Sequence, residues 1–283
     1  MFQLRDKTQF SKRTRTLLFL FSALLMLSAC GEDRELDNAV LKMNEDNILF
    51  MNISLGFIML GVALKLRVKD FILVFSAPKS VLIGFLSQFV ALPFLTFLLV
   101  LILNPMPSVA MGMMIVAACP GGNISNFMTA LANGNTALSV CMTAIASVTA
   151  VFMTPFNISF WGGMYAPTSE ILSDVSLDFF AMLKIVGMIL LIPLTIGMLL
   201  RQFKPKIADF LLPITHYGSI LIFGGIVVFA FGANTDLFVK YIHLIVFIVL
   251  AHNALGILTG FSLARVFRLP SADQKTLAIE TGI

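Results

Sequence analysis

The sequence predicts an all-α polytopic membrane protein, and three observations lead to this fold class. Of the 283 residues, 58% are hydrophobic and 12% are charged, about half the charged fraction of an average soluble domain. The apolar residues form long blocks of about 20 residues, the length that an α-helix needs to cross a bilayer. Lysine and arginine gather at the ends of these blocks. Because lipid offers no hydrogen-bond partner to irregular backbone, we expect the blocks to be membrane-spanning helices.

The apolar blocks after residue 47 predict seven complete spans and the start of one more. They cover Ile48–Leu64, Val81–Leu103, Met111–Leu131, Thr136–Phe156, Phe179–Leu200, Phe210–Phe231 and Tyr241–Arg265, with the start at Thr276. The residues from Thr276 to Ile283 cover only about 12 Å as a helix, against a hydrocarbon core of about 30 Å. We therefore expect the sequence to end inside the membrane, as a truncated chain.

The basic residues predict the orientation of these spans. Of the 19 lysines and arginines, 15 lie in the N-terminal segment and in alternate loops, and the loops between them are mostly acidic. The positive-inside rule then predicts a multi-pass protein of a bacterial inner membrane, whose N-terminus is cytoplasmic before any signal cleavage. The basic residues form no stripe with interleaved aromatic residues, so we do not expect nucleic acid as a partner. The sequence gives no oligomeric state.

Residues 1–30 form a separate segment with a basic start and an apolar stretch, Leu17–Ala29, of signal-peptide length. The tetrapeptide Leu27-Ser28-Ala29-Cys30 resembles a bacterial lipoprotein processing site, at which Cys30 would be lipidated. A short first transmembrane helix is the alternative. In both cases residues 31–47 would be periplasmic, and residues 48–283 would form the membrane domain.

The span Met111–Leu131 contains the run Pro120-Gly121-Gly122 at its middle. Proline removes a helix hydrogen bond and glycine relaxes the preference for helix, so we expect a break there. Broken helices at membrane depth are tolerated where they line a cavity, and their ends can coordinate ions and anions. Three side chains with oxygen atoms follow the break: Asn123, Ser125 and Asn126. A kinked packing helix is the alternative interpretation.

Four more polar residues within the predicted spans are candidates for a functional site. Ser139 and Thr143 share one helix face, which can turn toward the break. Gln88 lies in an otherwise apolar stretch, where a helix–helix hydrogen bond would also explain it. Glu280 is the only acidic residue that we place within a span, and intramembrane carboxylates are candidates for function. An interfacial position is the alternative for Glu280. The three cysteines share no metal or disulfide spacing, and the sequence contains no phosphate loop or nucleophile–base pair.

Taken in order, these motifs resemble the bile acid:sodium symporter family. The resemblance rests on the break with its polar residues, the run Leu131-Ala-Asn-Gly-Asn-Thr-Ala-Leu-Ser139, Gln88 before Pro93, the His252-Asn253-x-x-Gly pattern and Glu280-Thr-Gly. It implies a transporter domain at residues 48–283 with two inverted repeats of five helices, arranged as a panel and a core in which two broken helices cross. The chain would lack the end of helix 9 and all of helix 10, so we expect this 283-residue form not to transport by itself.

The resemblance also implies the ligands of two sodium ions. One site would use Ser125, Asn126, Ser139, Thr143 and Glu280; the other would use Gln88, Glu280 and backbone carbonyls around Thr281 and Ile283. Sodium is a hard cation that prefers such oxygen atoms. An organic anion, bile acid-like or smaller, would bind nearby with Asn123 as a contact. Sodium would be the coupling ion and the only metal, with no other cofactor. The lipid bilayer would be a further partner.

Three alternatives remain at this point. The chain could be a carrier of the same fold that moves another anion or couples to protons, with Glu280 as the protonation site. It could also be a membrane-anchored protein without transport activity, which the Cys30 motif would suit, or an inactive fragment. An intramembrane enzyme would need a catalytic pair or a metal set at membrane depth, and the sequence contains neither.

Overall fold

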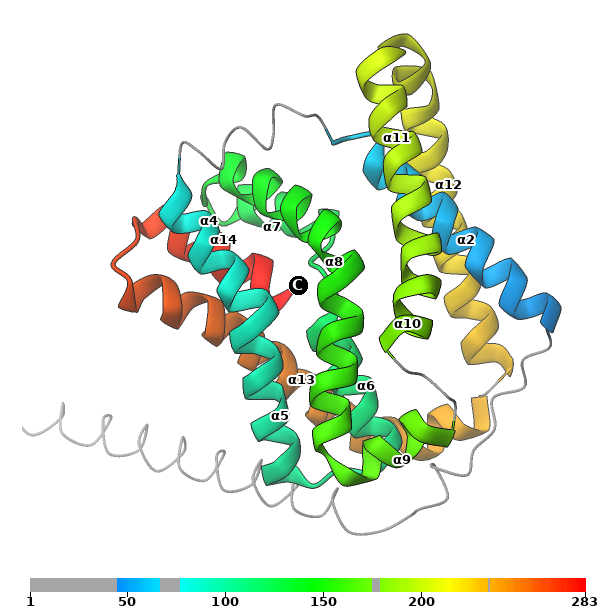
Figure 1. The fold of residues 1–283 in the computed structure, drawn as a ribbon, viewed down its shortest axis with the longest axis vertical. Coiled ribbons are helices and arrows are strands. Elements are labelled where there is room, and N and C mark those ends of the chain that lie inside the picture. The colour runs from blue at the N-terminus through cyan, green and yellow to red at the C-terminus, as the bar shows by residue number, and fades with distance from the viewer. Residues whose placement is uncertain (1–44, 67–76, 175–178, 234) are drawn as a thin grey trace, which may run out of the picture.

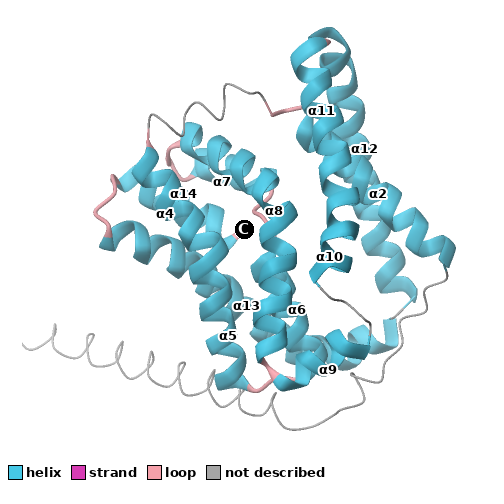
Figure 2. Ribbon diagram, viewed as in Figure 1, coloured by secondary structure: helices cyan, strands magenta, loops and turns pink. Residues whose placement is uncertain are grey.

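The computed structural model describes residues 45–66, 77–174, 179–233 and 235–283. Within these ranges every regular element is a helix and none is a strand (Figure 2), which confirms the predicted all-α fold class. Cys30 and the whole signal-like segment lie outside the described residues, as does most of the predicted periplasmic segment.

The helices form two bundles, which Figure 1 shows side by side. The panel bundle contains α2 (Glu45–Ala63), α10 (Phe179–Val186), the π-helix η2 (Gly187–Leu191), α11 (Ile192–Phe203) and α12 (Pro205–Ala233). The core bundle contains α4 (Pro78–Leu86), the π-helix η1 (Ser87–Ala91), α5 (Leu92–Leu103), α6 (Pro107–Ala118), α7 (Asn123–Leu131), α8 (Thr136–Met164), α13 (Thr235–Val266) and α14 (Ser271–Gly282). A short helix, α9 (Ala166–Asp174), follows α8.

The predicted spans coincide with helices, but some boundaries differ. Within the described ranges, four helices are long and apolar enough to cross a membrane: Pro78–Leu103, Thr136–Met164, Pro205–Phe229 and Ile245–Val266. Three shorter apolar helices accompany them, at Leu49–Ala63, Pro107–Ala118 and Gly187–Phe203. The last helix begins at Ser271, five residues before the predicted start, and α9 was not predicted at all. Both differences arise because a polar helical turn carries no hydropathy signal.

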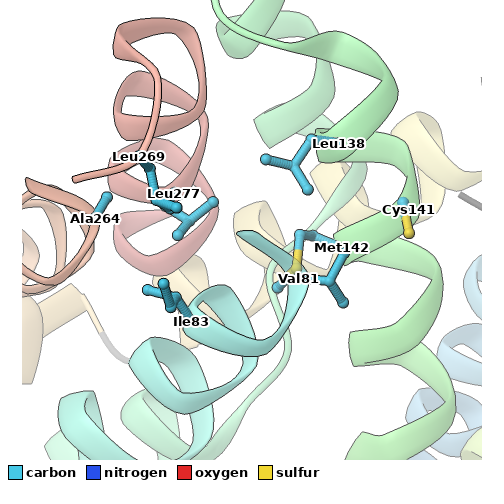
Figure 3. Close-up of a cluster of buried hydrophobic side chains, with 8 residues drawn as sticks. All are labelled: Val81, Ile83, Leu138, Cys141, Met142, Ala264, Leu269 and Leu277. Carbon is cyan, nitrogen blue, oxygen red and sulfur yellow. The ribbon is translucent and has the colours of Figure 1, made fainter. Parts of the chain in front are cut away.

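A cluster of buried apolar side chains joins four helices of the core bundle (Figure 3). It consists of Val81, Ile83, Leu138, Cys141, Met142, Ala264, Leu269 and Leu277. These residues come from α4, α8, α13, the turn after α13, and α14. Through this cluster the last helix of the chain packs against α4 and α8, which are far from it in sequence. The core bundle therefore holds the predicted break and Glu280 in one packed unit.

Helices α13 and α14 approach each other through glycines. A Cβ atom on Gly260 would collide with the backbone carbonyl of Leu277, and one on Gly256 would lie 3.0 Å from the carbonyl oxygen of Thr281. Small residues four apart let two helix backbones come this close. The contact fixes the position of α14, which carries Glu280.

Helix α7 ends in a tight turn that leads directly into α8. Asn133 adopts a left-handed conformation with a φ of 52°, and the N–H of Gly134 donates to the Thr129 carbonyl at 2.9 Å. This is the Schellman arrangement that closes many helices. Asn135 then caps α8, because its side-chain oxygen accepts the N–H of Leu138 at 3.1 Å. The turn directs α8 back along α7, so that the two helices face each other.

Candidate functional site

The predicted helix break is present between α6 and α7, and it spans Cys119 to Gly122. Helix α6 ends at Ala118, and the next residue, the exposed Cys119, is already extended, with a ψ of 149°. Gly122 is extended as well, and α7 begins at Asn123. The carbonyl end of one half-helix and the N–H end of the other therefore meet at the break, where the Ala118 carbonyl accepts a hydrogen bond from Thr154 Oγ1 at 2.8 Å.

Glu280 approaches this break from α14. A Cβ atom on Gly121 would lie 2.9 Å from the backbone oxygen of Glu280 and 3.6 Å from its side-chain Oε2. Only glycine permits this approach without a shift of the backbone. The Glu280 side chain is 2% exposed. The break thus receives a buried carboxylate from a helix that lies more than 150 residues further along the chain.

Three hydroxyl groups surround the Glu280 carboxylate. Ser125 Oγ donates to Oε1 at 2.7 Å, and Thr143 Oγ1 lies 3.2 Å from Oε2. The third hydroxyl, that of Ser139, contacts Oε1. Asn126 completes the group, because its Oδ1 lies 2.8 Å from the Ser139 hydroxyl and 3.4 Å from that of Thr143. The structure thus brings together all five residues that the sequence predicted for the first sodium site.

This cluster contains more acceptor oxygens than hydrogen atoms. Each hydroxyl has one hydrogen, but Ser125 Oγ also lies 2.6 Å from the Gly122 carbonyl, and Thr143 Oγ1 lies 3.1 Å from the Ser139 carbonyl. Several oxygen lone pairs therefore face each other with no hydrogen between them. Such a group attracts a cation, and oxygen atoms of this kind suit a hard one.

Gln88 lies beside the same break, on η1. Its side chain is 3% exposed, and its Oε1 has no hydrogen-bond partner among the described residues. Its Nε2 would be 3.5 Å from a Cβ atom on Gly121. The neighbouring Ser87 pairs with Thr281 of α14, with their hydroxyl oxygens 2.9 Å apart. A buried amide oxygen without a partner is costly, so Gln88 is a candidate for binding a ligand.

The other predicted site residues have simpler surroundings. Asn123 is the first residue of α7, and its side chain lies outside what the structure describes. Ile283 follows α14, and its N–H donates to the Ile279 carbonyl at 3.0 Å. The Thr281 carbonyl lies against α13, near Gly256. The two predicted backbone ligands are therefore close to Glu280 in sequence, but the Thr281 carbonyl lies against a neighbouring helix.

The structure adds a buried acidic residue that sequence reasoning missed. Asp273, in the first turn of α14, is 7% exposed and accepts hydrogen bonds from Ser80 Oγ at 2.6 Å and Asn135 Nδ2 at 2.9 Å. Asn135 N also donates to Thr276 Oγ1 at 2.8 Å. The sequence signal was the turn before α8 together with an acidic residue after Pro270, a pattern typical of helix starts. This network joins the beginnings of α4, α8 and α14.

Within the described residues, no group of three or more His, Cys, Asp or Glu side chains could hold a metal ion. The oxygen cluster differs from such sites because hydroxyls and amides dominate it, with one carboxylate. That composition favours a singly charged hard cation over a transition metal.

Comparison with known proteins identifies relatives over most of the chain. The sequence pattern of the Sodium Bile acid symporter family matches residues 52–241. The chain is 33% identical to the "Uncharacterized sodium-dependent transporter YocS" of Bacillus subtilis, over 83% of this chain and 70% of that protein. It is 30% identical to the "Probable sodium/metabolite cotransporter BASS1, chloroplastic" of Arabidopsis thaliana and 28% identical to the mouse "P3 protein". The chain spans about half the length of these last two proteins.

Proposed function

This chain belongs to the Sodium Bile acid symporter family, and we propose that it carries an organic anion across the bacterial inner membrane together with sodium ions. The family and its relatives named as sodium-dependent transporters make the chain a membrane transport protein of the multi-pass class and not an enzyme. The identity of the anion, the sodium ligands and the mechanism below are proposals.

The oxygen cluster around Glu280 carries the proposal. In the first sodium site the ion would be held by Ser125, Asn126, Ser139, Thr143 and Glu280, whose oxygens already converge. In a buried site a carboxylate needs a compensating charge, and one sodium ion supplies it. The hydroxyl hydrogens of Ser125 and Thr143 would turn toward the Gly122 and Ser139 carbonyls, which lie within reach.

The second sodium site would lie on the other side of Glu280, toward η1. Gln88 would contribute its Oε1, which has no hydrogen-bond partner among the described residues. The family resemblance implies backbone carbonyls around Thr281 and Ile283 as the other ligands, and the Thr281 carbonyl would have to turn from α13 to take part. Two cations beside one carboxylate leave a net positive charge, and the N-terminal end of α7 adds a partial positive charge. An organic anion, bile acid-like or smaller, is then the complementary third ligand, and Asn123 at that helix end would contact it.

Transport would follow from rocking of the core bundle against the panel bundle. Sodium and anion stabilise each other in the site, so that each raises the affinity for the other by the same factor. The oxygen cluster lies wholly on core helices, which lets the core move as one body with its ions. The panel would provide the fixed surface against which the core changes its exposure from one side of the membrane to the other.

The basic residues support a cytoplasmic position for one end of the bundles. Figure 1 shows the start of α4 and the α11–α12 turn at the same end of the molecule, whereas α9 and the α5–α6 loop lie at the opposite end. Lys79, Lys204 and Lys206 lie at the first end and Glu170 lies on α9. By the positive-inside rule the first end would face the cytoplasm.

The test is uptake of radiolabelled taurocholate and of small organic acids into liposomes that contain a full-length version of the protein. We expect an inward sodium gradient to drive uptake of at least one anion, and Glu280→Gln to abolish it. Uptake that persists when choline replaces sodium would contradict the sodium coupling. If uptake then followed a proton gradient instead, Glu280 would be assigned as a protonation site.

A further inference from the structure

We propose that Asn157 is a positioning residue for the second sodium site, because its side chain holds η1 in the register that presents Gln88. The inference rests on the proposed function and adds a residue from outside the ligand set. Asn157 lies on α8 and is 2% exposed. Its contacts explain why a polar residue stands at this buried position.

The π-helix η1 ends at Ala91, two residues before Pro93. In an α-helical register the N–H of residue 93 would bond to the Phe89 carbonyl, but proline has no N–H and its ring crowds that carbonyl. The chain adopts the wider π register instead, in which the N–H of Leu92 bonds to the carbonyl of Ser87, five residues back. The Phe89 carbonyl therefore cannot receive the hydrogen bond that residue 93 would give it in a regular helix.

Asn157 supplies a donor to this carbonyl from the neighbouring helix. Its Nδ2 donates to the Phe89 oxygen at 3.1 Å, and its Oδ1 accepts the indole N–H of Trp161 at 3.2 Å. A carbonyl can only accept and an indole N–H can only donate, so a single orientation of the amide satisfies both partners. The side chain of Asn157 is thus fixed from both sides.

The same segment of η1 carries Gln88, and three contacts hold the segment in place. The Phe89 ring is 1% exposed and packs with Ala146 and Ala150 of α8. The Phe89 carbonyl is held by Asn157, and the Gln88 amide lies beside Gly121 at the helix break. These contacts together set the direction in which Gln88 points.

Loss of the Asn157 donor would leave the buried Phe89 carbonyl without this hydrogen bond. A change in the helical register of η1 would relieve that cost. A shift of one residue turns each side chain by about 100° around the helix axis. Gln88 would then point away from the break, although nothing in the ligand set had been altered. Sodium binding at the second site would weaken for this reason alone.

The test is equilibrium binding of ²²Na⁺ to the purified full chain, with potassium as the replacement ion. Four proteins are compared: wild type, Gln88→Ala, Asn157→Leu, and the double variant. Substitution of residues that orient ligands weakens metal binding by about 10-fold or more, and we expect Asn157→Leu to weaken sodium binding by about 10-fold. Because Asn157 acts through Gln88, the double variant should bind no more weakly than Gln88→Ala.

Two controls separate positioning from folding. Trp161→Phe leaves the bond between Asn157 and Phe89 in place and should change sodium binding by less than about twofold. Asn157→Asp keeps the size and the acceptor for Trp161 but removes the donor, so it should reproduce the effect of Asn157→Leu if the leucine variant folds poorly. Rescue of sodium binding in Asn157→His, whose ring N–H can reach toward the carbonyl, would further support the positioning role.

The outcomes distinguish the two proposals. If wild type binds no sodium, the proposed function is wrong and this inference falls with it. If Gln88→Ala weakens binding but Asn157→Leu and Asn157→Asp bind like wild type, only the positioning role is wrong. Additive losses in the double variant would also overturn it, because they would show that Asn157 acts on the protein independently of Gln88.

Discussion

The hydroxyl of Ser139 donates to the carboxylate of Glu280 across a separation of 141 residues. Ser139 stands on α8 directly after the α7–α8 turn, and Glu280 stands near the end of α14. The contact forms because α14 packs on α13 through glycines and on α8 through a shared apolar cluster. It joins α8 to the carboxylate from α14, and the sodium proposal depends on it.

Sodium should stabilise the folded protein, because it would bind the oxygen cluster only when the cluster is assembled. At a sodium concentration tenfold above the dissociation constant, the stabilisation should be about 1.4 kcal/mol. Thermal unfolding in detergent, with potassium as the replacement ion, measures it. Glu280→Gln should remove the sodium-dependent part of the midpoint shift. An equal shift in wild type and Glu280→Gln would show that sodium acts elsewhere.

Thr143→Ala should weaken sodium binding, because it removes an oxygen that lies 3.2 Å from Glu280 Oε2. We expect a loss of about 10-fold, as for other changes in the ligands of a metal site, and near wild-type binding in Thr143→Ser. The matched control is Thr149→Ala on the same helix, since the Thr149 hydroxyl bonds only to α8 backbone carbonyls, the nearer being Ile145 at 2.8 Å. Equal effects at both positions would argue against a ligand role. Binding of ²²Na⁺ is the measurement.

Gly121→Ala and Gly122→Ala should differ sharply although the residues are neighbours. A Cβ atom on Gly121 would lie 2.9 Å from the Glu280 backbone oxygen, whereas one on Gly122 meets nothing within 4 Å. Overpacking of this kind costs about 1–3 kcal/mol, and it would push Glu280 away from the break. We expect Gly121→Ala to lose sodium binding and Gly122→Ala to keep it. The reverse order of effects would contradict the close approach of α14.

Gly260→Ala should destabilise the core bundle, because its Cβ atom would collide with the Leu277 carbonyl of α14. We expect a loss of about 1–3 kcal/mol in the free energy of unfolding. Gly225→Ala on α12 is the control, since no atom lies within 4 Å of the added Cβ. A lower unfolding midpoint for Gly260→Ala alone is the expected result. Similar midpoints in both variants would mean that the two helices can separate without cost.

Asp273→Ala should also lower the unfolding midpoint, because Ser80 and Asn135 would lose a buried, charged acceptor. Hydrogen bonds to charged groups contribute about 1.5–3 kcal/mol each. Asp209→Ala provides the comparison: Asp209 forms an ion pair with Arg201, but its side chain is 66% exposed, so the change should cost less than about 1 kcal/mol. An unchanged unfolding midpoint in Asp273→Ala would show that the network at the start of α14 contributes little to the stability of the core bundle.

Much of the fold could be predicted from the chain because hydropathy and charge act locally. The apolar blocks predicted the helices, although some helix ends differ from the predicted ends by up to eight residues, and Pro120-Gly121-Gly122 predicted the position of the break. The polar start of α14 and the short helix α9 were missed, since neither is apolar over a full span. Asp273 was missed because its burial depends on partners that are distant in sequence, in α4 and in the α7–α8 turn.

By itself the sequence determined the spans, the polar residues that lie within them and the family motifs, because each depends on residues that are neighbours in the chain. Only the tertiary structure decided which polar residues meet. It brought the hydroxyls of α7 and α8 into hydrogen-bond contact with the carboxylate of α14, and it left Gln88 Oε1 without a partner among the described residues. It also placed Asn157 so that its amide donates to the Phe89 carbonyl, to which Pro93 has no N–H to donate. These relationships depend on how closely helices pack, and that distance is fixed by glycines and apolar contacts between segments far apart in the sequence.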